Sequence, residues 1–151
     1  MSLEFSILQL LHIVFTAWGL GGATVAAVLM LKAKKDQSMG QALLKVMAPI
    51  SKLIWLGLIG LIITGIAISA LGSGKGYFDA TTLLAKHVIV ILLLIFGLNI
   101  SLRLLPRLKA LAPKAGEKPS HKFLQVSKTL ALNSTLSLFL WYVITALSAA
   151  L

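Results

Sequence analysis

The chain has 151 residues, of which 58% are hydrophobic and only 12% are charged, and its mean hydropathy is +0.97. A soluble domain keeps about a quarter of its residues charged, so this composition excludes an ordinary soluble domain and indicates a membrane protein. Fourteen Lys and Arg residues outnumber four Asp and Glu residues, and there is no cysteine. Disulfides, iron–sulfur clusters and thiolate metal sites are therefore excluded.

Four runs of residues are long enough and apolar enough to cross a bilayer, at about 5–31, 53–71, 83–102 and 129–151. They predict an all-α fold, an integral membrane four-helix bundle that forms a single transmembrane domain over residues 1–151. The first run does not match a cleavable signal peptide, because no Lys or Arg precedes it and it is longer than the apolar part of such a peptide. We expect it to remain as a helix.

The basic residues are concentrated in two of the three connections between these runs. Five of the fourteen lie between the first and second runs, and seven lie between residues 103 and 128. Cytoplasmic loops carry such an excess of Lys and Arg, so we predict that both termini lie on the outer side, periplasmic or extracellular, of a prokaryotic plasma (inner) membrane. We interpret the basicity as contact with the lipid bilayer and its anionic head groups, and not with nucleic acid.

His12 is the most informative residue of the first run. A histidine within a bilayer needs a partner, because hydrocarbon cannot hydrate it. Thr16, Gly19 and Ala23 follow it at helical spacing, which places His12 above small residues on one helix face. Small residues let a neighbouring helix or a flat ligand approach closely. We therefore single out His12, Thr16 and Gly19 as candidate cofactor contacts, with plain helix packing as the alternative for the glycine.

The following segments carry fewer functional signals. Residues 42–50 have apolar side chains at helical spacing and predict a short interfacial helix, with Pro49 near its junction with the second run. Asp79, just before the third run, predicts an N-cap for that helix. The second run carries small residues along one face, at Gly57, Gly60, Thr64 and Ala67.

His87 lies about five residues into the third run, which crosses the membrane in the same direction as the first. At 1.5 Å of rise per residue, His12 and His87 should lie within about 3 Å of the same depth, near the outer face. Diagonal helices of a bundle leave a gap of about 12–14 Å, which accommodates a metal ion or a porphyrin standing on edge between the two imidazoles. Lys86 is positioned to pair with haem propionates, and a lysine that only extends to the interface is the alternative.

Other interpretations of the histidines stay open. In one alternative, the two residues bind copper or another divalent metal. In the other, His12 forms only a structural hydrogen bond across helices, for example to Thr145 or Ser148. His121 lies in the second basic connection and is predicted to be a solvated loop residue. No carboxylate lies inside a run, so neither hydrolytic nor proton-relay chemistry is predicted.

Two stretches resemble a known group of membrane proteins. Leu11-His12, followed by Trp18-Gly19-Leu20-Gly21-Gly22, resembles the opening helix of CopD-type copper-resistance proteins and of their small relatives, including the HemJ-type protoporphyrinogen oxidases. Lys86, Asn99 and the stretch Arg103-Leu-Leu-Pro106-Arg107-Leu108 resemble a later helix of the CopD type. The resemblance implies a four-helix membrane core that holds haem or handles copper, with the haem-associated histidine of HemJ-like proteins carried over to His12. Methionine-rich copper motifs are missing, which favours haem.

Our leading prediction is a small membrane cytochrome in which haem b is held by His12 and His87. Two imidazoles on opposite faces of the iron give a low-spin electron-transfer haem. We expect its redox partner to be a quinone or a periplasmic protein. Whether the protein is a haem-dependent oxidoreductase stays open, and so does the identity of any catalytic residues. The alternatives are a copper-handling or transport protein that uses the same histidines, and a cofactor-free structural subunit of a larger membrane complex. Self-association is equally open.

Overall fold

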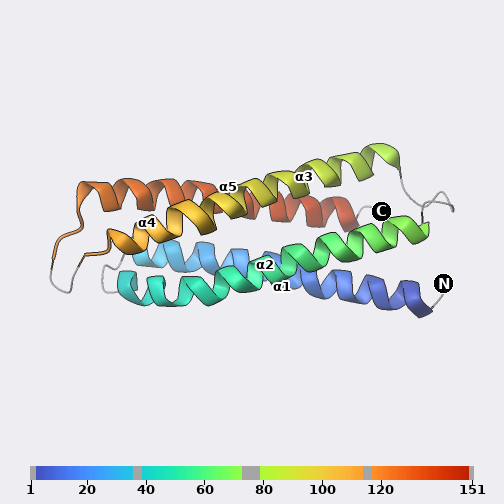
Figure 1. Cartoon of the computed structure of the whole chain (residues 1–151), viewed down its shortest axis with the longest axis horizontal. Coiled ribbons are helices and arrows are strands. Elements are labelled where there is room, and N and C mark those ends of the chain that lie inside the picture. The colour runs from blue at the N-terminus through green and yellow to red at the C-terminus, as the bar shows by residue number, and fades with distance from the viewer. Residues whose placement is uncertain (1–2, 36–38, 73–78, 114–116, 150–151) are drawn as a thin grey trace.

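The computed structural model describes residues 3–35, 39–72, 79–113 and 117–149, and these residues form helices joined by short connections (Figure 1). The long helices are α1 (Leu3–Lys35), α2 (Met39–Gly72), α3 (Ala80–Asn99) and α5 (His121–Ala149). Between α3 and α5 the chain forms a π-helical segment, η1 (Ile100–Leu104), and the short helix α4 (Leu105–Ala110). The predicted all-α class is confirmed.

Four helical segments of the described chain are long and apolar enough to cross a membrane: Leu3–Ala33, Leu43–Leu71, Ala80–Ala110 and His121–Ser148. Large apolar side chains cover their outer faces, as Ile63 and Phe139 illustrate with 62% and 63% exposure. Such a surface requires lipid around it, so the chain is an integral membrane protein. The N-terminus of α1 and the C-terminus of α5 lie at the same end of the bundle (Figure 1). Which side of the membrane that end faces stays a prediction.

The helices extend beyond the predicted apolar runs. The separate interfacial helix expected at residues 42–50 is part of α2, which continues through Pro49 without a break. With 34 residues, α2 is about 51 Å long, whereas the hydrocarbon core of a bilayer is about 30 Å thick. Charged residues mark where a helix leaves the hydrocarbon, but its internal hydrogen bonds continue into the head-group region. The charge pattern therefore underestimates helix length.

The helices pack so that α1 and α3 lie on a diagonal of the bundle. Helix α1 contacts α2 most extensively and α5 on its other side, while α3 packs against α5. Figure 1 shows the antiparallel α1–α2 pair beside the pair of α3 and α5. The helices that carry His12 and His87 therefore lie diagonally opposite each other.

The buried core occupies the middle of the bundle and the end opposite the termini. One cluster surrounds Trp141 and Leu93, and the second surrounds Met47, Leu104 and Leu130. At the other end, none of the described residues in 3–18, 65–71, 79–88 and 145–148 is buried. The helices also diverge toward that end (Figure 1). The tightly packed core therefore stops at about the level of His12.

Candidate functional site

The imidazole of His12 is held by a chain of hydrogen bonds between α1 and α2. His12 is half-buried, and its Nδ1 lies 2.7 Å from Oγ1 of Thr64, which is only 4% exposed. The Thr64 hydroxyl donates its one proton to the carbonyl oxygen of Gly60, at 2.7 Å. That hydroxyl must therefore accept a hydrogen bond from Nδ1–H of His12. The arrangement places a proton on Nδ1 of His12 and fixes the orientation of the ring.

His87 makes an equivalent hydrogen bond through Nδ1, but within its own helix. Its Nδ1 lies 2.7 Å from the carbonyl oxygen of Leu83, one turn earlier in α3. A carbonyl oxygen can only accept, so Nδ1–H of His87 donates. Within the described chain, Nε2 of neither His12 nor His87 has a hydrogen-bond partner. Nε2 is therefore the ring nitrogen that each histidine would use to bind a metal, in its neutral form.

Lys86 and His87 point to different sides of α3. Lys86 is half-buried, whereas His87 is exposed. Successive residues of an α-helix are about 100° apart around its axis, so both cannot face the interior. The structure therefore leaves His87 on the outer side of α3, with Lys86 on a less exposed side. Ligation of one cofactor by His12 and His87 stays a prediction.

Thr16 and Gly19 have structural contacts of their own. The Thr16 hydroxyl donates to the carbonyl oxygen of His12 at 2.8 Å. Gly19 leaves room for the indole of Trp141, which is the most completely buried large side chain of the described core; a Cβ at position 19 would overlap that ring. These contacts fit the helix-packing interpretation of Gly19, while contact of Thr16 or Gly19 with a cofactor stays a prediction.

The sequence did not single out Thr64 as the partner of His12. Thr145 and Ser148, which were considered instead, donate to carbonyl oxygens of their own helix, those of Trp141 and Ile144. The available signal was weak: Thr64 belongs to the small-residue face of the second run. A threonine on such a face places a hydroxyl where a neighbouring helix comes closest.

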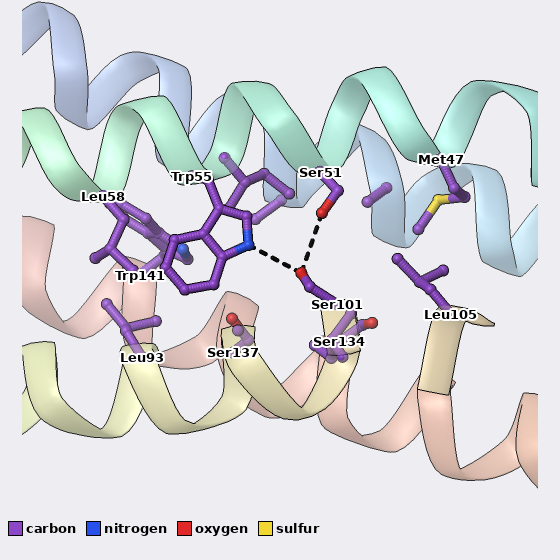
Figure 2. Close-up of a pocket in the computed structure, with 15 residues that line it drawn as sticks. Met47, Ser51, Trp55, Leu58, Leu93, Ser101, Leu105, Ser134, Ser137 and Trp141 are labelled. Carbon is purple, nitrogen blue, oxygen red and sulfur yellow. Dashed lines mark hydrogen bonds between the residues drawn. The ribbon is translucent and has the colours of Figure 1, made fainter. Parts of the chain in front are cut away.

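A second polar cluster lies deeper in the bundle, around a cavity of about 50 Å³ (Figure 2). The indole N–H of Trp55 donates to Oγ of Ser101 at 2.9 Å, and Oγ of Ser51 lies 3.3 Å from the same atom. Ser134 and Ser137 of α5 line the opposite wall. Apolar side chains such as Leu58 and Leu93 form most of the rest of the wall. The cavity is far too small for a porphyrin.

The π-helical segment η1 positions Ser101 at this cavity. Pro106 has no backbone N–H, and its ring crowds the carbonyl group one turn earlier. The preceding turn is wide, with the backbone N–H of Leu105 bonded to the carbonyl oxygen of Ile100. Just before it, the side-chain amide of Asn99 donates to Asn133 of α5 at 3.1 Å. Such π-helical turns often occur at functional sites, and here the turn gives α3 an irregular polar wall.

Comparison with known proteins adds no further constraint. Across the described residues, no group of three or more His, Asp or Glu side chains is placed to hold a metal ion. Neither a family model, nor a curated protein, nor a solved structure matches the chain.

Proposed function

We propose that this protein is a membrane haem protein of the b type, in which Nε2 of His12 is one axial ligand and His87 supplies the other. The observation that carries the proposal is the hydrogen-bond chain from His12 through Thr64 to the Gly60 carbonyl. Metal-binding histidines characteristically donate their second ring N–H to an oxygen, which sets the tautomer and the ring orientation. His12 and His87 both have this arrangement.

The donor set suits haem better than a bare metal ion. A porphyrin supplies four nitrogen atoms, so the protein needs to add only one or two axial ligands. A copper ion held by side chains alone generally needs a larger cluster of ligands, which the described residues do not provide. For this reason, and because the resemblance to CopD-type and HemJ-like proteins includes haem-associated members, we place copper handling second.

We propose that a porphyrin would bind toward the end of the bundle that holds the termini. The serine-lined cavity is too small, and the middle of the bundle is filled by Trp141. Beyond His12 the described helices contain no buried residue, so a flat ligand there would displace little packed protein. We propose that the half-buried Lys86 pairs with a propionate.

In this proposal the protein residues orient the cofactor and limit the access of lipid and water. Bound haem would supply one-electron transfer, with a quinone or a periplasmic redox protein as partner. Thr64 sets the orientation of the His12 ring, and Lys86 balances propionate charge. Because His87 is exposed, ligation through its Nε2 requires α3 to rotate about its axis. His87 is therefore the more demanding part of the proposal.

A cofactor-free structural subunit is the second candidate. Two observations favour it: Thr64 already satisfies the one N–H of the His12 ring, and Trp141 already occupies the space beside Gly19. In that case His12 contributes only a hydrogen bond between α1 and α2.

A visible spectrum of the purified protein in detergent, with and without added haem, distinguishes the two candidates. We expect a Soret band and sharp α and β bands on reduction, which His12→Ala and His87→Ala remove or convert. His121→Ala is the matched control, because His121 is exposed at the start of α5, and it should leave the spectrum unchanged. A folded protein that takes up no haem, or a His12→Ala spectrum identical to wild type, would reject the haem proposal.

The substitution His87→Met tests the second ligand without removing bulk. A thioether in place of an imidazole should keep haem bound and raise its reduction potential. An unchanged potential in this variant would show that His87 is not a ligand, and the haem would then depend on His12 alone.

A further inference from the structure

A groove lies between α4 and the first turns of α5, at the end of the bundle opposite the termini. Its volume is about 460 Å³, and it is lined by Arg107, Ala110, Leu111, Lys122, Gln125 and Val126. The two segments that form it are separated in sequence by the last connection of the chain and lie at the same end of the bundle in Figure 1.

The groove is strongly positive. Arg107 and Lys122 enter it from different helices, both are exposed, and no carboxylate lines it. In the part of the chain that the structure describes, neither of these two side chains has an ion-pair partner. The surrounding segment 103–128 contains seven basic residues and a single acidic one. Two unpaired cations on one concave surface are suited to a multiply charged or bidentate anion.

The groove also has an apolar wall and lies at a membrane boundary. Val126, Leu111 and Ala110 provide the apolar contacts. The candidate membrane span Ala80–Ala110 ends beside the groove, and the span His121–Ser148 begins there. A ligand with a phosphate and acyl chains can therefore place its phosphate at the cations and its acyl chains against the apolar wall. A small soluble anion would leave the apolar wall without a contact.

We propose that this groove is a binding site for the head group of an anionic glycerophospholipid. The Arg107 guanidinium is the bidentate phosphate donor, Lys122 adds a second charge, and the Gln125 amide donates to a head-group oxygen. Leu111 and Val126 contact the glycerol backbone and the first acyl carbons. Basic pockets between membrane helices commonly bind lipid head groups in this way. The site is independent of the haem proposal, since it lies at the other end of the bundle.

Lipid binding to the full-length protein in detergent, followed by native mass spectrometry, tests this site. Phosphatidylglycerol is titrated against phosphatidylcholine of the same acyl chains. The groove variant is Arg107→Gln/Lys122→Gln, and the matched control is Lys109→Gln/Lys128→Gln, which removes the same charge from exposed positions of α4 and α5 that do not line the groove. Circular dichroism and an unfolding curve establish that both variants are folded.

We expect phosphatidylglycerol to bind wild type and control equally, and to bind the groove variant about 25-fold more weakly, or about fivefold for each cation removed. Phosphatidylcholine should bind all three weakly. Equal loss in the groove variant and the control would overturn the site in favour of general charge attraction. Retained binding in the groove variant would also overturn it. Displacement of the lipid by millimolar inorganic phosphate would assign the groove to a soluble anion instead.

Discussion

The hydrogen bond between His12 and Thr64 shows how this protein keeps a polar ring inside a bilayer. The ring N–H has no water to bind at that depth, so a hydroxyl on the neighbouring helix takes its place. The hydroxyl in turn donates within α2 to Gly60, so both the Nδ1–H of His12 and the Thr64 hydroxyl have a partner. The hydrogen bond stabilises the protein whether or not a cofactor binds, because its loss leaves the N–H of His12 without a partner.

We predict that Thr64→Val destabilises the protein by about 1–2 kcal/mol, because valine has the shape of threonine but cannot accept from His12. Thr64→Ser keeps the hydroxyl and should restore most of this stability. Unfolding in mixed detergent micelles, followed by circular dichroism, measures both changes. Equal stability of the valine and serine variants would show that the hydrogen bond between α1 and α2 contributes nothing.

Asp79 is a second residue whose role can be tested singly. Its carboxylate accepts from the backbone N–H and the hydroxyl of Thr82, both at 2.8 Å, and caps α3. These hydrogen bonds hold the pKa of Asp79 below its usual value of 3.8. Because the folded-state pKa is lowered, the cap is fully present above about pH 3.8 and is lost as the pH falls through the lower, folded-state value.

We therefore predict that the start of α3 frays in acid in the wild-type protein only. Amide hydrogen exchange at Thr82 and Leu83, corrected for intrinsic rates, should increase between pH 5 and pH 2. Asp79→Asn keeps an acceptor that does not titrate, so its exchange should not depend on pH in this window. The same pH dependence in Asp79→Asn would exclude the carboxylate as its cause.

At the scale of the elements, the close packing of α1 on α2 depends on glycine at the crossing point. A Cβ on Gly57 would lie 2.7 Å from Cα of Gly19 and 2.8 Å from the carbonyl oxygen of Phe15. These are backbone atoms, so they cannot move aside as a flexible side chain would. Gly60 meets the Phe15 ring in the same interface. The small-residue faces of the first two apolar runs thus serve mainly to bring the two backbones together.

We predict that Gly57→Ala destabilises the bundle by about 1–3 kcal/mol, because the helices must separate to admit one methyl group. Gly21→Ala is the matched control on α1: nothing lies within 4 Å of the added Cβ, and alanine favours a helix over glycine. Unfolding measurements should rank the control at or above wild type. If Gly57→Ala were equally stable, the α1–α2 contact would have to be looser than the structure has it.

Polar side chains contribute to the packing of helix α3. It contacts α5 and is held there by the amide pair of Asn99 and Asn133. The Trp55 indole of α2 packs over Gly97 of α3 and donates to Ser101 of η1. Leu58 of α2 shares a buried cluster with Leu93 of α3. Rotation of α3, which ligation by His87 requires, would have to break these hydrogen bonds and move Leu93 out of the core.

At the scale of the whole molecule, four spans place both termini on one face of the membrane and the basic connections on the other. We predict that alkaline phosphatase fused to the C-terminus is active, since this reporter folds only outside the cytoplasm, and that a cytoplasm-dependent fluorescent reporter at the same place is dark. The same two reporters fused after Pro113, in the second basic connection, should show the opposite result. A C-terminal fusion active only in the cytoplasm would reverse the orientation and move the His12 end to the cytoplasmic side.

The sequence by itself determined the class of this protein and the number of its spans. In hydrocarbon every backbone N–H and C=O group must be bonded within the chain, so an uncharged run of about 20 residues has few options besides a helix. The predicted apolar runs therefore correspond to the four helical segments of the structure. Asp79 was also identified correctly as an N-cap, because capping depends on residues adjacent in sequence.

Only the tertiary structure decided which sides of the helices meet. Lipid and bundle interior are both apolar, so a leucine-rich helix carries little pattern that marks its inward face. Helix rotation decides that Thr64 is the partner of His12 and that Trp141 fills the space at Gly19. It also decides that Lys86 is less exposed than His87. Rotation is set by the sum of many weak contacts between residues far apart in sequence, and no single spacing of residues in this chain expresses it.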